Sequence, residues 1–168
     1  MTLSMYQASV PTFIRVLTNL SEILKKGAAH AEAKKIDPVV LLNSRLFPNM
    51  FALTRQVQIV TDMTKGCGAR LAGQEPPSYE DTESSFPELI ARIEKTIGFL
   101  KTFSPAQIDG SEEKSVTLKI GGQSLSFLGL AYLLSYVLPN VYFHTTTAYN
   151  ILRHNGIELA KKDYLGNP

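Results

Sequence analysis

The sequence predicts an all-α fold: a four-helix bundle with a small β-hairpin inserted before the last helix. Apolar residues recur at spacings of three and four over four long stretches, which is the pattern of one helix face. Near residue 120 the pattern changes to strict alternation around two glycines, as in a hairpin. The links are mostly short, and 168 residues suit one domain. We therefore predict a single domain over residues 1–168.

The first helix is predicted from about Ser4 to Lys26. Pro11 lies inside this stretch and should kink the helix or mark a first turn, because proline lacks an N–H and clashes with the preceding turn. Gly27 should weaken the end of the helix, and Ala28 to Lys35 is expected to add a turn or two. The apolar face comprises Phe13, Val16, Leu17, Leu20, Ile23 and Leu24.

The second helix is predicted from about Asn49 to Leu71, after a connector that begins at Asp37. Asn49 is the expected N-cap and Gly73 the expected C-terminal stop. Its apolar stripe contains Leu53, Val57, Val60, Thr64, Cys67 and Leu71.

A loop from Gln74 to Ser85 carries four carboxylates, and we expect these to be solvated rather than to hold a metal. The third helix is predicted from about Phe86 to Thr102. Ser84 or Ser85 can cap it, and Pro87 suits its first turn.

The hairpin is predicted over Ser115 to Phe127, where apolar and polar residues alternate on both sides of Gly121-Gly122. An isolated hairpin is marginal in water, so this one should pack on the bundle or on a neighbouring subunit. The last helical region is predicted from Leu128 to Asn155, with a break or kink at Pro139-Asn140 and one further helical turn near the C-terminus.

Composition argues against several classes of function. The 17 basic residues are balanced by 15 acidic ones and form no long basic stripe, so we expect no nucleic-acid partner. The single cysteine, Cys67, cannot form an internal disulfide or a cysteine-based zinc cage, and we expect it to be buried and inert. No apolar run is long enough to span a membrane, and no secretory signal is visible, so we expect a cytoplasmic protein.

His144 is the strongest candidate for a functional residue, because at about 100° per residue it falls within the apolar face of the last helix. A histidine on such a face is partly buried and needs partners for its ring nitrogens. One interpretation is a core histidine satisfied by protein atoms; the other is a ligand-binding or catalytic acid/base group in a bundle cavity.

Four other residues are candidates for ligand binding: Gln56, Asp62, Tyr149 and His154. On the second helix, Gln56 lies near the apolar side and is well placed to meet His144. Asp62 shares the opposite face with Arg55 and Gln58, which is either a solvated face or a polar network at an interface or pocket rim. The Tyr149 hydroxyl could bond His144 or Gln56. His154 lies on the flank of the last helix, about 15 Å along the axis from His144, too far to share one metal ion with it.

Several stretches together resemble a bacterial family of unknown function within the DinB/YfiT-like four-helix-bundle superfamily. These stretches are Arg55-Gln56-Val57-Gln58 with Asp62, Ala69 to Gly73, Asp81-Thr82-Glu83, and Phe143 to Tyr149 continuing through Ile151 to Gly156. The resemblance covers almost the whole chain, and the last stretch is its most specific part. It implies an up-down-down-up bundle, often dimeric, so a homodimer is the expected assembly.

The resemblance also implies a comparison with metal-dependent thiol transferases and isomerases, whose metal is typically held by three histidines. One comes from the second helix and two lie four residues apart on the last helix. His144 matches the first of that last pair, but the second position is Ala148 and the second helix contains no histidine. The metal triad is therefore degenerate, and we assign no metal ligand.

Three hypotheses follow for the function. The first is a DinB-like protein that binds a small molecule in a pocket near His144, with Gln56 or Asp62 assisting. The second is a non-enzymatic homodimeric structural or binding module. The third is a metal-dependent thiol transferase or isomerase-like enzyme. The sequence names no substrate, reaction or cofactor.

Overall fold

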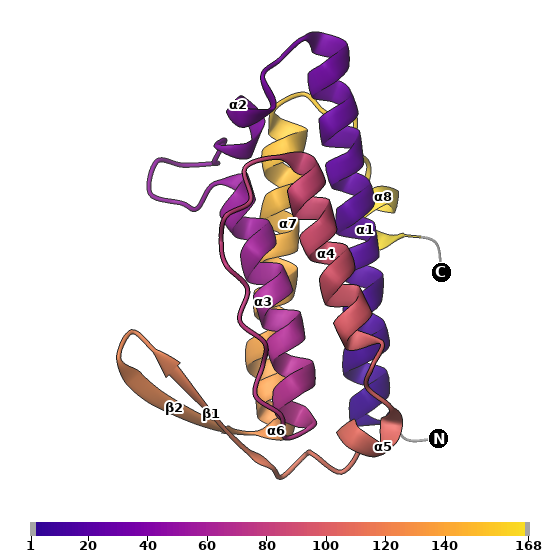
Figure 1. The fold of residues 1–168 in the computed structure, drawn as a ribbon, viewed down its shortest axis with the longest axis vertical. Coiled ribbons are helices and arrows are strands. Elements are labelled where there is room, and N and C mark those ends of the chain that lie inside the picture. The colour runs from indigo at the N-terminus through magenta and orange to yellow at the C-terminus, as the bar shows by residue number, and fades with distance from the viewer. Residues whose placement is uncertain (1–2, 167–168) are drawn as a thin grey trace.

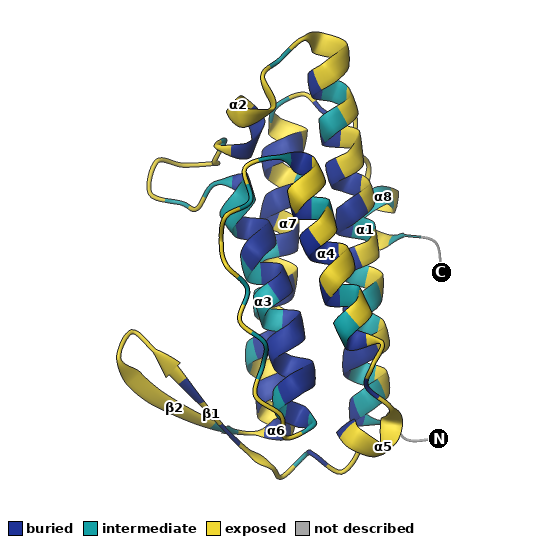
Figure 2. Ribbon diagram, viewed as in Figure 1, coloured by how far each residue is buried: buried dark blue, intermediate teal, exposed yellow. Residues whose placement is uncertain are grey.

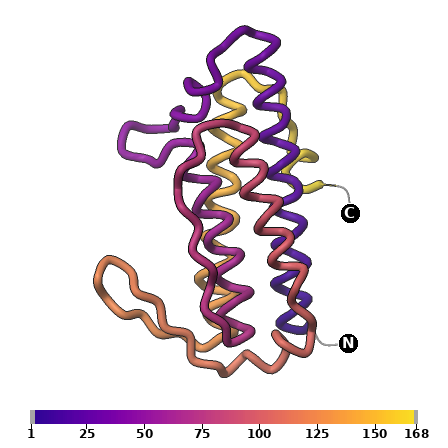
Figure 3. Tube along the Cα trace, in the orientation of Figure 1, coloured from indigo at the N-terminus to yellow at the C-terminus, as the bar shows by residue number. Residues whose placement is uncertain are grey.

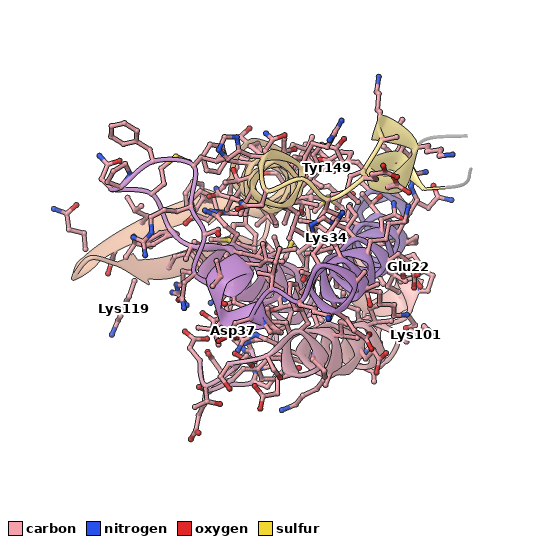
Figure 4. The ribbon with its side chains drawn as sticks, turned by 90° about the horizontal axis from the view of Figure 1, so that it is seen from above. Glu22, Lys34, Asp37, Lys101, Lys119 and Tyr149 are labelled. Carbon is pink, nitrogen blue, oxygen red and sulfur yellow. The ribbon has the colours of Figure 1, made fainter. Side chains whose placement is uncertain are left out.

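Four long helices lie side by side along the long axis of the molecule (Figure 1). The structure is a computed structural model that describes residues 3–166. α4 packs between α1 and α3, and α7 packs chiefly against α3. Viewed from above, the four helices surround one shared core (Figure 4). These helices are α1 (Met5–Lys34), α3 (Leu53–Leu71), α4 (Phe86–Leu100) and α7 (Leu138–His154).

Shorter elements connect the long helices, so the chain has more helices than the four predicted. The helical ones are α2 (Pro38–Leu42), α5 (Pro105–Ile108), α6 (Gly129–Ala131), a π-helical segment (Tyr132–Val137) and α8 (Lys161–Leu165). The strands β1 (Ser115–Ile120) and β2 (Gln123–Leu128) pair antiparallel. The prediction of a mostly helical chain with a hairpin before the last long helix is confirmed.

The first helix is continuous from Met5 to Lys34, so the turns expected over Ala28 to Lys35 follow Gly27 without a break. A Cβ at Gly27 would lie 3.1 Å from the ring of Phe86 and 3.2 Å from Leu152. Here α4 and α7 approach α1 closely, and this packing outweighs the ~1 kcal/mol helix penalty of glycine. The glycine marks close helix packing rather than a helix end.

The predicted start of the second helix is wrong by about one turn. α3 begins at Leu53, and its N-cap is Ala52, which makes no side-chain cap bond. The backbone N–H of Leu53 donates instead to the carbonyl of Ser44 at 3.0 Å. The connector, and not Asn49, therefore satisfies the first exposed donor of the helix.

The hairpin forms around Gly121-Gly122 as predicted, and its register places Val116 opposite Phe127. Both glycines have positive φ, 56° and 82°, as a two-residue hairpin turn requires. The expected break before Pro139 takes the form of the π-helical segment, and Pro139 itself lies in the first turn of α7, where its missing N–H costs little.

Buried side chains line the faces that the long helices turn toward one another, while their outer faces are exposed (Figure 2). Cys67 is buried in this core, as expected. Two segments extend away from the helices to the same side, the 43–52 connector and the hairpin (Figure 3). Within residues 3–166, no helix has both the length and the apolar character needed to cross a bilayer.

Candidate functional site

His144 lies half-buried on α7, where this helix faces α3, and its ring is held by Gln56. The Nδ1 atom of His144 is 2.7 Å from Oε1 of Gln56. The Nε2 group of Gln56 donates to the carbonyl of Phe51 at 3.0 Å, so the Oε1 atom of Gln56 faces the imidazole. An amide oxygen can only accept, so Nδ1 carries the proton and Nε2 of His144 carries the lone pair.

The Nε2 atom of His144 is open to a further partner. No hydrogen-bond partner of Nε2 lies among residues 3–166. This atom is not fully buried either, so solvent reaches it. Burial of the ring, together with the positive charge of Arg55, lowers the pKa of His144 below its usual 6.5. The imidazole is therefore neutral near pH 7 and presents a basic nitrogen.

Two residues with exposed aromatic rings contact the pair formed by His144 and Gln56. Phe143 is 58% exposed and meets the His144 ring edge to face, with 5.2 Å between centroids. Phe51, whose carbonyl holds Gln56, is 55% exposed. The start of the connector that carries Phe51 is held near α3, because Thr54 Oγ1 donates to the carbonyl of Leu42 at the end of α2, at 3.2 Å. The site thus combines a neutral base with accessible apolar surface.

A second polar cluster, which sequence reasoning missed, surrounds Arg92 of α4. The guanidinium is buried, with only 2% of its side chain exposed, and it binds both α3 and the 74–85 segment. Its Nε donates to Thr61 at 2.7 Å and its NH1 to the Glu80 carbonyl at 2.9 Å. It also pairs with three carboxylates, those of Asp62 (3.0 Å), Asp81 (3.0 Å) and Glu83 (2.9 Å).

The Arg92 cluster fixes part of the acidic loop: Glu83 is largely covered, while Glu75, Glu80 and Asp81 are exposed as expected. Burial alone would raise the pKa of Glu83, but hydrogen bonds from Arg92 and Gln58 outweigh it and lower the pKa. Arg55 pairs with Asp81, which also contacts Arg92. The cluster is therefore linked through Arg55 to the surroundings of His144.

Only one of the four predicted ligand-binding residues, Gln56, contacts His144. Asp62 forms no direct hydrogen bond with Arg55 or Gln58. It pairs with Lys65 at 2.6 Å and with Arg92. Tyr149 points toward α8 and donates to the Leu159 carbonyl at 3.3 Å (Figure 4). His154 is exposed in the last turn of α7.

The residues present do not fit the metal that the family resemblance implies. The second histidine position of α7 holds Ala148, which is fully buried and offers no ligand. Gln56 accepts from the Nδ1–H of His144, so Nε2 is the only ring nitrogen left for a metal ion. Among residues 3–166, no group of three or more His, Cys, Asp or Glu side chains gathers at metal-binding distance. One imidazole with amide neighbours is a weak donor set for a divalent ion.

The interactions of Arg92 could have been anticipated from the sequence. Arg92 lies three residues after Leu89 and directly before Ile93, within a buried stripe, and a charge at such a position demands partners. The carboxylates of the preceding loop, residues 74–85, were the available ones. The carbonyl of Phe51 left no signal, because a backbone contact does not depend on the side chain that carries it.

Comparison with known proteins agrees with this architecture. The family model described as DUF1993, domain of unknown function, matches residues 5–165. The crystal structure of a DinB family member protein from Shewanella denitrificans is similar, with a TM-score of 0.87 and 42% sequence identity over 97% of this chain and 92% of that one. No curated protein matches the chain. The chain therefore belongs to the DUF1993 family and is a DinB-like protein.

Proposed function

We propose that the protein binds a small molecule at His144 without a metal ion. The observation that supports this proposal is the bond between Nδ1 of His144 and Gln56, whose own amide group is held by Phe51. This chain of bonds fixes the ring and its tautomer. The ligand then donates a hydrogen bond, or gives up a proton, to Nε2.

The surroundings of His144 define the class of ligand. The exposed rings of Phe51 and Phe143 provide apolar contact for a flat or aliphatic body. The neutral Nε2 atom accepts from a hydroxyl, thiol or amide N–H. The positive charge of Arg55 favours a ligand that becomes anionic when it loses a proton. A small, mostly apolar molecule with one acidic donor satisfies all three features.

Phenol and anisole form a matched pair of probes, because they share a shape and only phenol has a donor. We expect phenol to shift the ¹⁵N resonance of His144 Nε2 in a saturable titration, and anisole to have little effect. His144→Gln should abolish the response. A wild-type protein that responds equally to both probes, or a free protein whose proton resides on Nε2, would contradict the proposal.

A homodimeric binding module is the second candidate function, and exposed apolar residues on and beside the hairpin favour it. These are Leu125, Leu128, Leu130 and Leu134. A second copy packed there would cover surface that a monomer leaves in water. Sedimentation equilibrium tests this directly: Leu128→Asp combined with Leu134→Asp should convert a dimer to a monomer, and a monomeric wild type refutes the assembly.

A further inference from the structure

A cavity of about 730 Å³ opens between α1, α7 and α8, away from His144. Its lining includes Pro11, Arg15 and Val16 of α1, Tyr142 of α7, and Tyr164 and Leu165 of α8. Tyr142 and His144 are two residues apart on α7, so at about 100° per residue they point to different sides of the helix. The volume lies within the range of small-molecule sites, roughly 300–1,000 Å³.

The α8 wall of this cavity is held in place by polar contacts. Lys26 of α1 pairs with Asp163 at 2.7 Å. Asn19 Nδ2 donates to the carbonyl of Tyr164 at 3.0 Å, and Thr146 Oγ1 donates to the Tyr164 hydroxyl at 3.1 Å. A ligand would therefore meet a largely preformed site and would not have to order this helix.

Arg15 supplies the cavity with a positive charge. No carboxylate among residues 3–166 lies within 4.0 Å of its guanidinium. The hydroxyl of Tyr142 shares the same cavity and has no hydrogen-bond partner among those residues. Burial and Tyr164 raise the pKa of Tyr142 while Arg15 opposes them, so the hydroxyl stays protonated near pH 7 and can donate.

We propose that this cavity binds an aromatic monocarboxylate. The planar guanidinium of Arg15 pairs with the carboxylate in two-pronged geometry, and the Tyr142 hydroxyl donates to the same group. The aromatic body lies against Pro11, Val16 and Leu165, which form the apolar part of the lining. The head group and the body are thus recognised by different parts of one cavity, a combination that a neutral or purely apolar molecule does not satisfy.

The probe is 3-phenylpropanoate, and its amide, 3-phenylpropanamide, is the matched neutral compound. By calorimetry and by chemical-shift mapping, we expect saturable binding of the carboxylate, with shifts confined to α1, α7 and α8. Arg15→Gln should weaken it by about 10-fold or more, as expected for loss of a charge-assisted bond. Tyr142→Phe should weaken it by roughly 3–10-fold, as expected for one hydrogen bond.

Arg153→Gln is the matched control, because Arg153 is exposed on α7 outside the cavity lining. It should leave affinity unchanged. Three results would overturn the proposal: no saturable binding of 3-phenylpropanoate, equal affinity for the amide, or equal losses in Arg15→Gln and Arg153→Gln. The last of these would show attraction to overall positive charge rather than to a site.

Discussion

Replacing Arg92 by methionine tests how strongly one buried guanidinium holds the acidic segment to the helices. Methionine keeps the length and most of the apolar volume of the side chain but removes all five donors. Glu83, only 12% exposed, would lose its main ion pair, and Thr61 would lose the bond to its hydroxyl. A carboxylate left in a poorly hydrated position is the main source of the expected destabilisation.

The magnitude follows from the exposure of the three carboxylates. Removing one partner of a buried pair costs roughly 3–5 kcal/mol. Asp62 and Asp81 are 37% and 40% exposed, so water compensates them and only Glu83 bears the full penalty. We therefore expect a loss of about 3 kcal/mol in the free energy of unfolding. For a domain of this size that loss lowers Tm by roughly 6–12 °C.

Urea unfolding followed by circular dichroism, with calorimetry for Tm, measures this loss. Arg153→Met is the control, because it removes an exposed arginine and should change stability by no more than about 0.5 kcal/mol. The double variant Arg92→Met/Glu83→Gln should recover part of the loss, because it removes the unpaired charge. Equal stability of Arg92→Met and Arg153→Met would refute the argument.

The pH dependence of the Arg92→Met variant provides a second check on the same reasoning. The pKa of Glu83 is lowered in the folded protein, so its contribution is complete above pH 4.5 and is lost as the pH falls through the folded value. The difference between wild type and Arg92→Met should therefore shrink in acid. A difference that stays constant from pH 7 to strong acid would place the effect in packing rather than in charge.

Three further predictions concern other parts of the molecule. Gly129→Ala should destabilise the protein by about 1–3 kcal/mol, because a Cβ there would overlap the Ser111 carbonyl. Gly98→Ala has open space around it and should stabilise the protein by about 0.5–1 kcal/mol. Urea unfolding measures both changes. Cys67 should resist a thiol reagent until the protein unfolds, because burial raises the pKa of its thiol; rapid native labelling would contradict this. The folded pKa of His144 is lowered, so stability should rise with pH from that value up to 6.5, and His144→Asn should remove this rise in a pH series of unfolding curves.

The long helices were predictable because each buries one face, and that face imposes its period on the sequence. The hairpin was predictable because few residues other than glycine adopt the backbone angles of its turn. The errors lie where tertiary contacts outweigh local preference. Gly27 has low helix propensity, yet Phe86 and Leu152 need its missing side chain. α3 starts late because Ser44, which is distant in sequence, supplies its first acceptor.

The pairing of His144 with Gln56 could be anticipated only from helical angles, which place both side chains toward the inside of the bundle. The same angles placed Asp62 on one face with Arg55 and Gln58, but a helical wheel shows which face a residue occupies and not what covers that face. The 74–85 segment and Arg92 cover it here. Tyr149 was misplaced for a related reason, since the segment between α7 and α8 provides its hydrogen-bond partner and the sequence gives little indication of where that segment packs.

Two of the three features that distinguish this site from a histidine metal triad disfavour a cation. Ala148 removes a ligand, Gln56 occupies the proton-bearing nitrogen of His144, and Arg55 places positive charge near the ring. Ala148 and the charge of Arg55 weaken cation binding, while Gln56 holds the imidazole in one orientation and one tautomer. The combined effect is a neutral base whose open nitrogen suits a neutral or acidic ligand, and this is the physical basis for proposing a metal-independent role for His144.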